Sequence, residues 1–126
     1  MDFSRFVQRV QERAHTPSRE ASATAAICVL TTLSERISPG QRRNLSAQLP
    51  NELKPMILSS DRQEGFGARE FVRRVKGRCG VDHDEAEALT QAVLGTLGEA
   101  IMPGELDDVA AELPREYDPL LGRGNA

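Results

Sequence analysis

The sequence predicts an all-α fold, a helical bundle built from two pseudo-repeats that each hold three helices plus a short fourth helix. Three observations lead to this prediction. Apolar residues recur at three- and four-residue spacing, no long stretch alternates apolar and polar residues as a strand would, and the two halves of the chain resemble each other. A length of 126 residues with a hydrophobic fraction of 39% is typical of one folded unit. We therefore expect a single helical domain over 1–126.

The internal repeat is clearest between residues 29–57 and 93–121. At an offset of 64, thirteen of these 29 positions are identical without a gap, and the identities fall on prolines, a glycine and apolar positions. Upstream, Phe6-Val7 aligns with Phe71-Val72 at an offset of 65. The expected parts are repeat one over about 2–58, a polar surface linker over 59–67, repeat two over about 68–121 and a frayed tail over 122–126.

The first helix of each repeat is expected over 2–14 and 68–79. Its apolar residues lie on one stripe with helical spacing, which marks the buried face. The stripe consists of Phe3, Phe6, Val7 and Val10 in the first copy and of Phe71, Val72, Val75 and Cys79 in the second.

The second helix is the longest, near 20 residues, and should form the core of each unit. In repeat one, Thr16 is the expected N-cap and Pro17 the first helical residue. In repeat two, Asp82 is the expected N-cap, with Glu85 completing a capping box. The expected core positions are Ala23, Ala26, Ile27, Leu30, Leu33 and Ile37 in the first copy and Leu89, Val93, Leu97 and Ile101 in the second.

The third helix starts at a Pro-Gly pair in each repeat, and in the first copy Ser38 can cap it. It should end before the Leu-Pro pairs at 49–50 and 113–114, because a residue before proline is driven out of the helical region. Those prolines can open the short fourth helix. In the linker, Phe66 is expected to pin the chain onto one repeat.

The order of these pieces is similar to that of a known family. A leading Phe-Val, a Val-Leu-x-x-Leu helix, Pro-Gly and then Gln/Glu-Leu-Pro resemble the bacterial domain-of-unknown-function 2267 family. The most specific pieces are Ala-Gln-Leu-Pro at 47–50 and Ala-Glu-Leu-Pro at 111–114, and the resemblance covers about residues 2–121. It implies a small, helical, cytosolic bacterial protein without an assigned activity, and it supplies no catalytic residues.

Composition limits the cellular setting. No apolar run approaches the roughly 18 residues of a membrane helix, and the first residues contain no apolar signal core. Cys28 and Cys79 are too few for a disulfide scaffold, so we expect reduced thiols and a cytoplasmic location. Cys28 should be a small buried residue. Cys79 could be partly exposed and oxidisable, and His83 is four residues away, but a nucleophilic Cys79 is strongly disfavoured because a catalytic thiol needs a positioned base.

Charge is unevenly distributed along the chain. Residues 1–60 carry eight basic and five acidic side chains, and residues 61–126 carry eight basic and fourteen acidic ones. Three hypotheses explain the basic helix over 69–78: it pairs with the acidic third helix of repeat two around Glu105 and Asp107, with another copy of the chain, or with phosphates. This expected interaction surface consists of Arg69, Arg73, Arg74, Lys76 and Arg78.

Glu35 and Glu99 are matched acids near the ends of the two long helices. Across a pseudo-twofold axis they could form a dicarboxylate ligand site, or each could bond a backbone N–H or an arginine such as Arg36 or Arg42. Beside Asp82, Asp84 and Glu87, His83 is interpreted as part of a solvated helix N-terminus rather than a weak divalent metal site.

The sequence therefore predicts no catalytic residue, no metal site and no cofactor. The leading hypothesis is a non-catalytic cytosolic protein-interaction or scaffold module that binds a protein partner or another copy of itself. The alternative is a small-ligand-binding protein or enzyme with its site between the repeats. Nucleic-acid binding through the helix over 69–78 is a weaker alternative, because the overall pI is 5.4 and aromatic residues are few.

Overall fold

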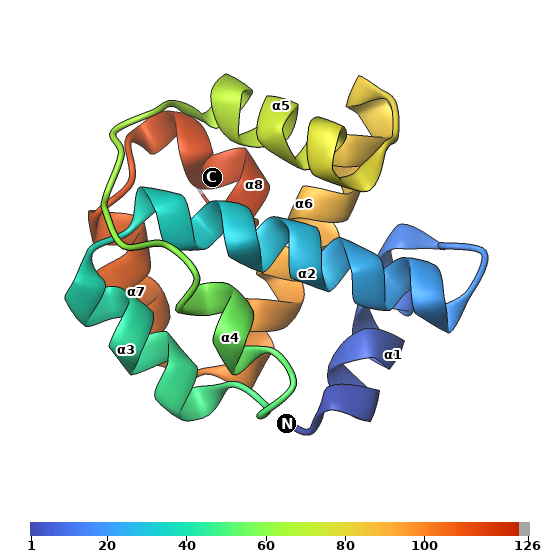
Figure 1. The fold of residues 1–126 in the computed structure, drawn as a ribbon, viewed down its shortest axis with the longest axis horizontal. Coiled ribbons are helices and arrows are strands. Elements are labelled where there is room, and N and C mark those ends of the chain that lie inside the picture. Colours follow the sequence, from blue (N-terminus) through green and yellow to red (C-terminus); the bar gives the residue numbers. More distant parts are fainter. Residues whose placement is uncertain (124–126) are drawn as a thin grey trace.

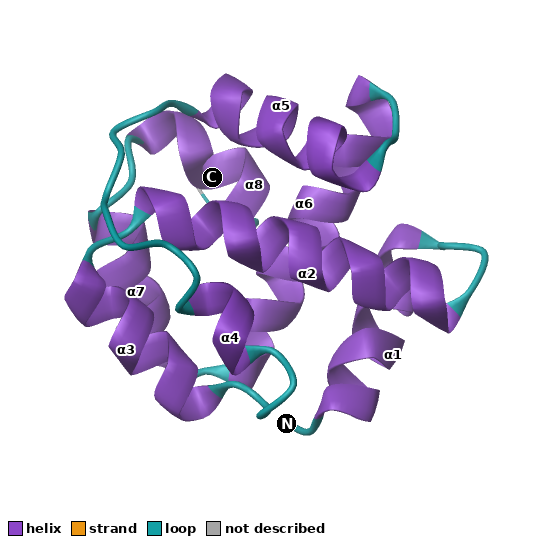
Figure 2. Cartoon of the chain, viewed as in Figure 1, coloured by secondary structure: helices purple, strands orange, loops and turns teal. Residues whose placement is uncertain are grey.

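The computed structural model describes residues 1–123, and this part of the chain is helical without strands (Figure 1, Figure 2). The predicted all-α class is confirmed. The elements, in chain order, are α1 (Phe3–Ala14), α2 (Arg19–Arg36), α3 (Pro39–Gln48), α4 (Lys54–Ile57), α5 (Ala68–Cys79), α6 (His83–Ala100), α7 (Pro103–Ala111), the 3₁₀ helix η1 (Arg115–Tyr117) and α8 (Asp118–Leu121).

The two long helices form the centre of the bundle. In Figure 1, α2 crosses in front of α6, with α5 above it and α1 below it. Both first helices contact both long helices: α1 packs against α2 and α6, and α5 packs against α6 and α2. Each first helix thus contacts the long helix of the other half of the chain as well as its own.

Three of the four pairs of corresponding helices have equal lengths, and the third pair differs by one residue, with ten in α3 and nine in α7. Both α1 and α5 have 12 residues, α2 and α6 have 18, and α4 and α8 have four. One buried apolar cluster takes side chains from both halves, including Phe6, Leu30, Phe71, Leu94 and Tyr117, each at most 1% exposed. A chain of about 60 residues buries only a modest core, and sharing one cluster enlarges it.

Side-chain caps define the starts of α1, α2, α3 and α6. Ser38 Oγ accepts from the backbone N–H of Gln41, and Asp82 Oδ1 accepts from that of Glu85 at 2.8 Å, as predicted. The predicted start of α2 is wrong. Ser18 is its N-cap, because its extended backbone lets its Oγ accept from Ala21 N at 3.0 Å, and Pro17 lies before the helix.

Two further expectations are corrected. Ile27 is not a core residue: 39% of it is exposed, because its side of α2 faces away from the apolar cluster. The short fourth helices begin later than the prolines at 50 and 114. A turn precedes α4, with the Pro50 carbonyl accepting from Leu53 N and Lys54 N, and η1 precedes α8.

The linker is held against the bundle by hydrogen bonds to both halves. Glu64 N donates to the Glu35 carbonyl at 2.8 Å. The carbonyl of Phe66 accepts from Arg36 Nε at 2.7 Å and from the Tyr117 hydroxyl at 2.8 Å. Phe66 therefore anchors the linker, as expected, but to both halves rather than to one. In the expected frayed tail, Arg123 pairs with Asp107 at 3.0 Å, and residues 124–126 lie outside the described residues.

Candidate functional site

The first functional candidate is a polar cluster between α2 and α5, built around Glu35. Arg78 donates to both carboxylate oxygens of Glu35, at 2.8 and 2.6 Å, and Arg74 donates to one of them at 3.1 Å. Arg78 also donates to Thr32 Oγ1 at 2.7 Å. We call this set of Thr32, Glu35, Arg74 and Arg78 the α2–α5 clamp.

A second cluster with the same composition joins α1 to α6. Arg9 donates to both oxygens of Glu99 at 2.9 Å, and Arg13 also bonds Glu99. Arg13 donates to Thr96 Oγ1 at 2.9 Å. These residues, the α1–α6 clamp, align with those of the α2–α5 clamp at the offsets found in the sequence. Each clamp joins the first helix of one half to the long helix of the other.

Both clamps hold their carboxylates in the charged form. Hydrogen bonds from Arg9, assisted by Arg13, lower the pKa of Glu99 to about 2. Hydrogen bonds from Arg78, assisted by Arg74, likewise lower the pKa of Glu35. A planar guanidinium that binds both oxygens of a carboxylate also fixes the relative orientation of the two helices.

Glu35 and Glu99 therefore belong to separate clusters, each with its own two arginines. The structure bears out the expectation that each carboxylate bonds an arginine, but the arginines are not Arg36 or Arg42. Arg42 Nε donates to the Ser34 carbonyl, and the Arg36 guanidinium lies over the Tyr117 ring. The contacts favour a structural role for both acids, and a ligand between them stays a prediction.

The five basic residues of α5 divide into two groups. Arg74 and Arg78 face the bundle, and Arg74 also bonds Glu64 and Glu70 and lies 3.9 Å from the centre of the Phe66 ring. Arg69, Arg73 and Lys76 are exposed and share one stripe of the helix. We call these three the α5 basic stripe. Arg73 bonds Glu70 at 2.7 Å but keeps 74% of its side chain exposed.

Of the three hypotheses for the basic helix, pairing with the acidic third helix is not what the contacts show. The arginines of α5 bond carboxylates of α2, the linker and α5 itself, because α5 packs on α2 and α6. Two of the acids near α7 have other partners: Asp107 bonds Arg123, and Glu112 accepts from Ser38 N and Oγ at 2.8 and 2.7 Å.

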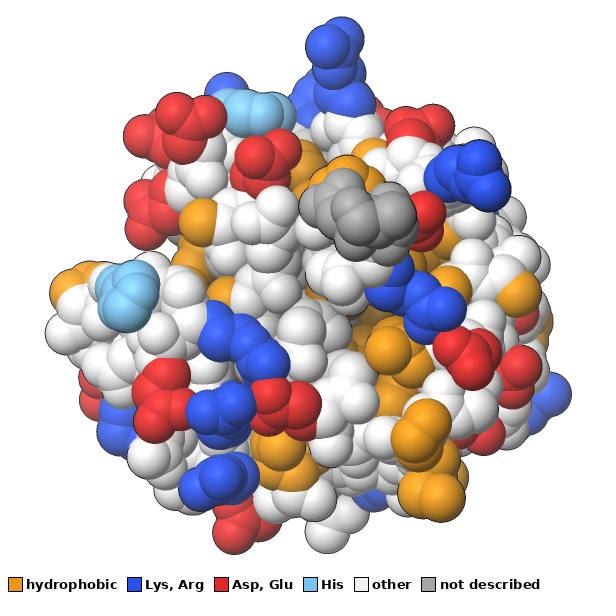
Figure 3. Space-filling model, turned by 180° about the vertical axis from the view of Figure 1, so that it is seen from behind, with side chains coloured by type: hydrophobic (Ala, Val, Ile, Leu, Met, Phe, Trp, Pro, Cys, Tyr) orange, Lys and Arg blue, Asp and Glu red, His pale blue; other side chains and the backbone are white. Residues whose placement is uncertain are grey.

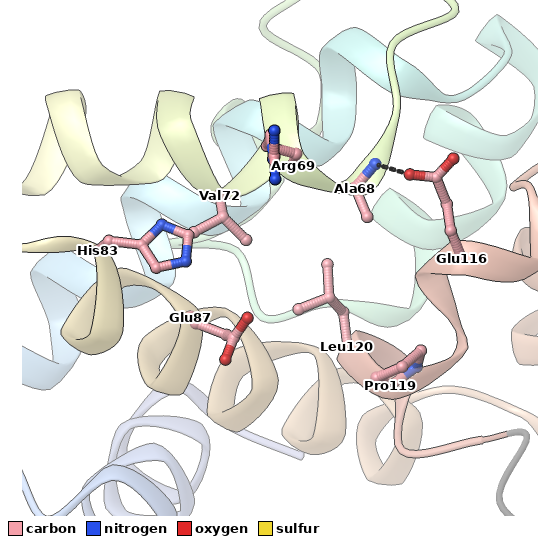
Figure 4. A pocket seen from close by; sticks show the side chains of 8 residues that line it. All are labelled: Ala68, Arg69, Val72, His83, Glu87, Glu116, Pro119 and Leu120. Atoms are coloured by element: carbon pink, nitrogen blue, oxygen red, sulfur yellow. Dashed lines mark hydrogen bonds between the residues drawn. The ribbon is translucent and has the colours of Figure 1, made fainter.

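A cleft of about 300 Å³ opens between α5, α6 and α8 (Figure 4). Its floor is apolar, with Val72 from α5 and Leu120 from α8 facing each other. At one end Glu116 accepts from Ala68 N, at the start of α5, at 2.9 Å. Its remaining lining residues are Arg69, His83, Glu87 and Pro119. The cleft can thus offer one guanidinium, one imidazole and a carboxylate to a small ligand.

A smaller hollow of about 210 Å³ occupies the corresponding place in the first half, lined by Phe3, Val7, Arg19, Glu20 and Ala23. By the sequence offsets, Phe3 aligns with Ala68 and Ala23 with Glu87. The second-half cleft is therefore larger where an alanine replaces a phenyl ring, and it carries a carboxylate where the first half has a methyl group.

Charges of both signs are interspersed on the face turned away from the view of Figure 1, with hydrophobic side chains between them (Figure 3). Within residues 1–123, no group of three or more His, Cys, Asp or Glu side chains is arranged to hold a metal ion. Asp82, His83, Asp84 and Glu87 are exposed at the start of α6, where Asp82 serves as its cap. No helix of the described part combines the length and apolar character needed to cross a membrane.

Sequence reasoning missed Arg9, Arg13 and the two threonines of the clamps, and it assigned Arg74 and Arg78 to an external interaction surface. A signal was available, because Arg9 and Arg13 align with Arg74 and Arg78 at the offset of 65, and Thr32 aligns with Thr96 at 64. Repeated polar residues on otherwise apolar helices indicate a shared contact. What the offset alone does not reveal is that each contact runs to the other half of the chain.

Fold and site together define a helical protein whose two halves are joined by matched arginine–glutamate clamps. The model of the uncharacterized conserved protein family DUF2267 matches residues 3–120, and the chain belongs to this family. A comparison with curated proteins found no match.

Proposed function

We propose that this protein is a non-catalytic interaction module whose α5 basic stripe binds an acidic protein surface. One observation carries the proposal. The stripe residues Arg69, Arg73 and Lys76 are exposed, and the aligned positions of α1 are the uncharged Ser4, Gln8 and Gln11.

This comparison separates the arginines that hold the helices together from the basic residues that are available to a partner. The clamp arginines occur in both first helices, so the bundle itself accounts for them. The stripe occurs in one helix only, and the other first helix packs in its corresponding place without it. Because the fold does not require the three basic residues of the stripe, we infer that they form a binding surface for an external partner. Charge complementarity would contribute mainly to association rate and specificity, which makes binding sensitive to salt.

The partner would be another protein or a second copy of this chain. The second half offers a complementary surface on the same molecule, since the first turn of α6 holds the exposed Asp84 and Glu85, and Asp108 of α7 is exposed too. Binding between the stripe of one copy and these acids of another would give a homo-oligomer.

The test replaces the stripe with the residues of the aligned helix. The variant Arg69→Ser, Arg73→Gln, Lys76→Gln should keep the fold, because α1 carries these residues at matching positions. At low salt we expect the native chain to self-associate, measured by light scattering, or to capture an acidic protein partner. This binding should be lost in the variant, and in the native chain at high salt. The control variant replaces three exposed arginines outside the stripe, Arg5, Arg43 and Arg62, by uncharged residues. It should retain binding.

Two outcomes would contradict the proposal. The first is a native chain that is a strict monomer at low and high salt and captures no protein. The second is a stripe variant that associates as well as the native chain. A band shift with single- or double-stranded nucleic acid, lost in the stripe variant, would instead support the nucleic-acid alternative.

A second candidate function is small-ligand binding in the cleft between α5, α6 and α8. The observation that favours it is the difference between the halves: the cleft is larger than its counterpart and gains Glu87 and His83 where the first half has Ala23 and Arg19. A mainly apolar hollow with a few polar groups is the usual form of a small-molecule site.

Mass spectrometry of the gently purified protein tests this candidate. A retained small molecule that disappears in the Ala68→Phe variant would support it. That substitution fills the cleft with the side chain that the first half carries at the aligned position, Phe3. A ligand that persists in the variant, or a native protein without one, would count against the cleft as a site.

We also infer a cytoplasmic location. The two cysteines support it, since both Cys28 and Cys79 are free thiols, as is usual in a reducing compartment. Fractionation of cells that produce the protein is the direct test, and recovery outside the cytoplasmic fraction would contradict the inference.

A further inference from the structure

The two cysteines come from different halves of the chain and meet at the α2–α5 interface. Contacts along this interface run in opposite chain directions: Arg74 and Arg78 bond Glu35, and Arg78 bonds Thr32. Cys28 lies one turn before Thr32 on α2, and Cys79 directly follows Arg78 on α5. Cys28 and Cys79 are therefore the next pair of positions along the interface, on helices that pack against each other.

The thiols also influence each other's protonation. The neighbouring Cys79 thiol and the charge of Arg78 lower the pKa of Cys28, although burial opposes this shift. The neighbouring Cys28, burial and the charge of Glu85 on α6 raise the pKa of Cys79. The two thiols therefore titrate as an interacting pair.

Packing does not require sulfur at either place. In the matching α1–α6 interface, Ala14 aligns with Cys79 and Ala92 aligns with Cys28. Ala92 is buried, at 3% exposure, and Ala14 packs against the same core, so two methyl groups fill the corresponding space. The α2–α5 interface differs by having a thiol on both sides. Packing alone does not explain the two cysteines, so we look for a role in the chemistry of their thiols.

Small reagents have a route to the pair. Cys79 is half-buried and lines a cavity of about 160 Å³ between the start of α2 and the first turns of α6. Thr16, Thr24 and Glu85 give this cavity polar groups. A hydroperoxide is small enough to enter it and reach the Cys79 sulfur, whereas a protein thiol is not.

We propose that Cys28 and Cys79 are a redox modification site, a dithiol that a hydroperoxide converts to a reversible disulfide between the two halves. One thiol of the pair, as its thiolate, attacks one peroxide oxygen, the O–O bond breaks, and water or an alcohol leaves after taking up a proton. The second sulfur then attacks the sulfenic acid so formed, and its proton leaves with the hydroxyl group as water. Two thiols lose two hydrogens in all, the peroxide is reduced, and a dithiol reductant reverses the bond.

The disulfide would lock an interface that the clamp already closes. Residues 28 and 79 are far apart in sequence, so a bond between them restricts the unfolded chain strongly. It would also tie α5, which carries the α5 basic stripe, to α2. The oxidised protein should resist unfolding more than the reduced protein.

The experiment treats the full chain with excess hydrogen peroxide, then counts thiols and measures the intact mass under denaturing conditions. We expect loss of both thiols, a monomer lighter by two hydrogen atoms, and a higher unfolding midpoint, all reversed by dithiothreitol. Cys28→Ala and Cys79→Ala provide the controls. Each should fold, because alanine occupies both aligned positions in the other interface, and neither should show the mass loss or the rise in midpoint.

Other oxidation products would overturn the proposal. Peroxide-treated native protein that keeps two thiols refutes the site. Addition of oxygen atoms to one cysteine without loss of hydrogen shows that the sulfurs do not bond. Disulfide-linked dimers without the intramolecular product show that the reactive thiol is an isolated one.

Discussion

At the scale of single residues, the arginine–glutamate pairs of the clamps are the most specific feature of the molecule. Arg78 binds both oxygens of Glu35 and Arg9 binds both oxygens of Glu99, a geometry that the planar guanidinium allows and the lysine ammonium does not. Glu35 is the more enclosed of the two acids, with 21% of its side chain exposed against 34% for Glu99. Its pair should therefore be the less screened by solvent.

Replacing Glu35 by glutamine should lower the free energy of unfolding by about 1 kcal/mol, since the neutral amide leaves Arg78 without a carboxylate partner and Arg74 with Glu64 and Glu70 only. Urea unfolding followed by circular dichroism measures the change. Glu52→Gln is the matched control, because Glu52 is exposed outside both clamps, and it should change stability little. Equal effects of the two substitutions would show that the clamp does not stabilise the fold.

The clamps also predict a dependence of stability on pH. The pKa of Glu99 is about 2 in the folded protein, below the value of about 4.3 for an unperturbed glutamate. A lowered pKa contributes stability that is complete above the unfolded value and is lost as pH falls towards the folded value. The free energy of unfolding should thus decrease as the pH falls from about 5 to about 2, the range that spans these two pKa values.

The double variant Glu35→Gln, Glu99→Gln should show a smaller decrease over the same range, because neither position can then take up a proton. Urea unfolding at several pH values gives both curves. Parallel curves for the native chain and the double variant would mean that other carboxylates account for acid sensitivity.

At the scale of helices, local capping and tertiary packing determine different properties. The caps at Asp2, Ser18, Ser38 and Asp82 each satisfy a backbone N–H that the helix leaves unpaired. The start of α2 shows how closely two candidate caps can compete: Thr16 precedes a proline, yet Ser18 has the extended backbone that makes the bond. Thr16 bonds Ser22 Oγ and the Ser18 carbonyl instead.

Ser18→Ala should therefore destabilise the protein by about 1 kcal/mol, the usual effect of losing an N-cap side chain. Pro17→Ala should have a much smaller effect, because Pro17 is exposed and lies outside α2. Thermal or urea unfolding of the two variants distinguishes the caps. If Pro17→Ala were the more damaging, the helix would start at Pro17 after all.

At the scale of the whole molecule, the contacts between the halves decide stability. The first helix of each half binds the long helix of the other through a clamp, and one apolar cluster spans both halves. Separating the halves would expose the faces of α2 and α6 that meet at the centre and would deprive the four clamp arginines of Glu35 and Glu99.

We therefore expect a chain ended after Ser60 to lack a cooperative thermal transition, and the same for residues 61–126 alone. Mixing the two fragments should restore helicity and cooperative melting by circular dichroism. A first fragment that melts cooperatively by itself would contradict a single domain and would show that each half folds independently.

Much of this molecule was predictable from local signals. Helical spacing of apolar residues predicted the helices, proline and cap residues predicted several of their ends, and the self-similarity predicted corresponding lengths. The exposure of Ile27 and the start of α2 were not predictable in this way. Both depend on small differences that the sequence pattern does not separate: which side of a buried helix faces solvent, and which of two neighbouring hydroxyls has the right backbone angle.

Local sequence was enough to predict that the chain is helical and where its recurring elements lie, because helix formation depends on neighbours three and four residues apart. The packing of the helices was needed to show that each clamp joins opposite halves, that Phe66 bonds both halves, and that Cys28 and Cys79 lie on facing helices. The hydrogen-bonded partners lie 30 or more residues apart in the chain, and a carboxylate or a carbonyl carries no local signal of which distant group it will contact. Their pairing follows from the way the two long apolar helices cross, and the packing of the core determines that crossing.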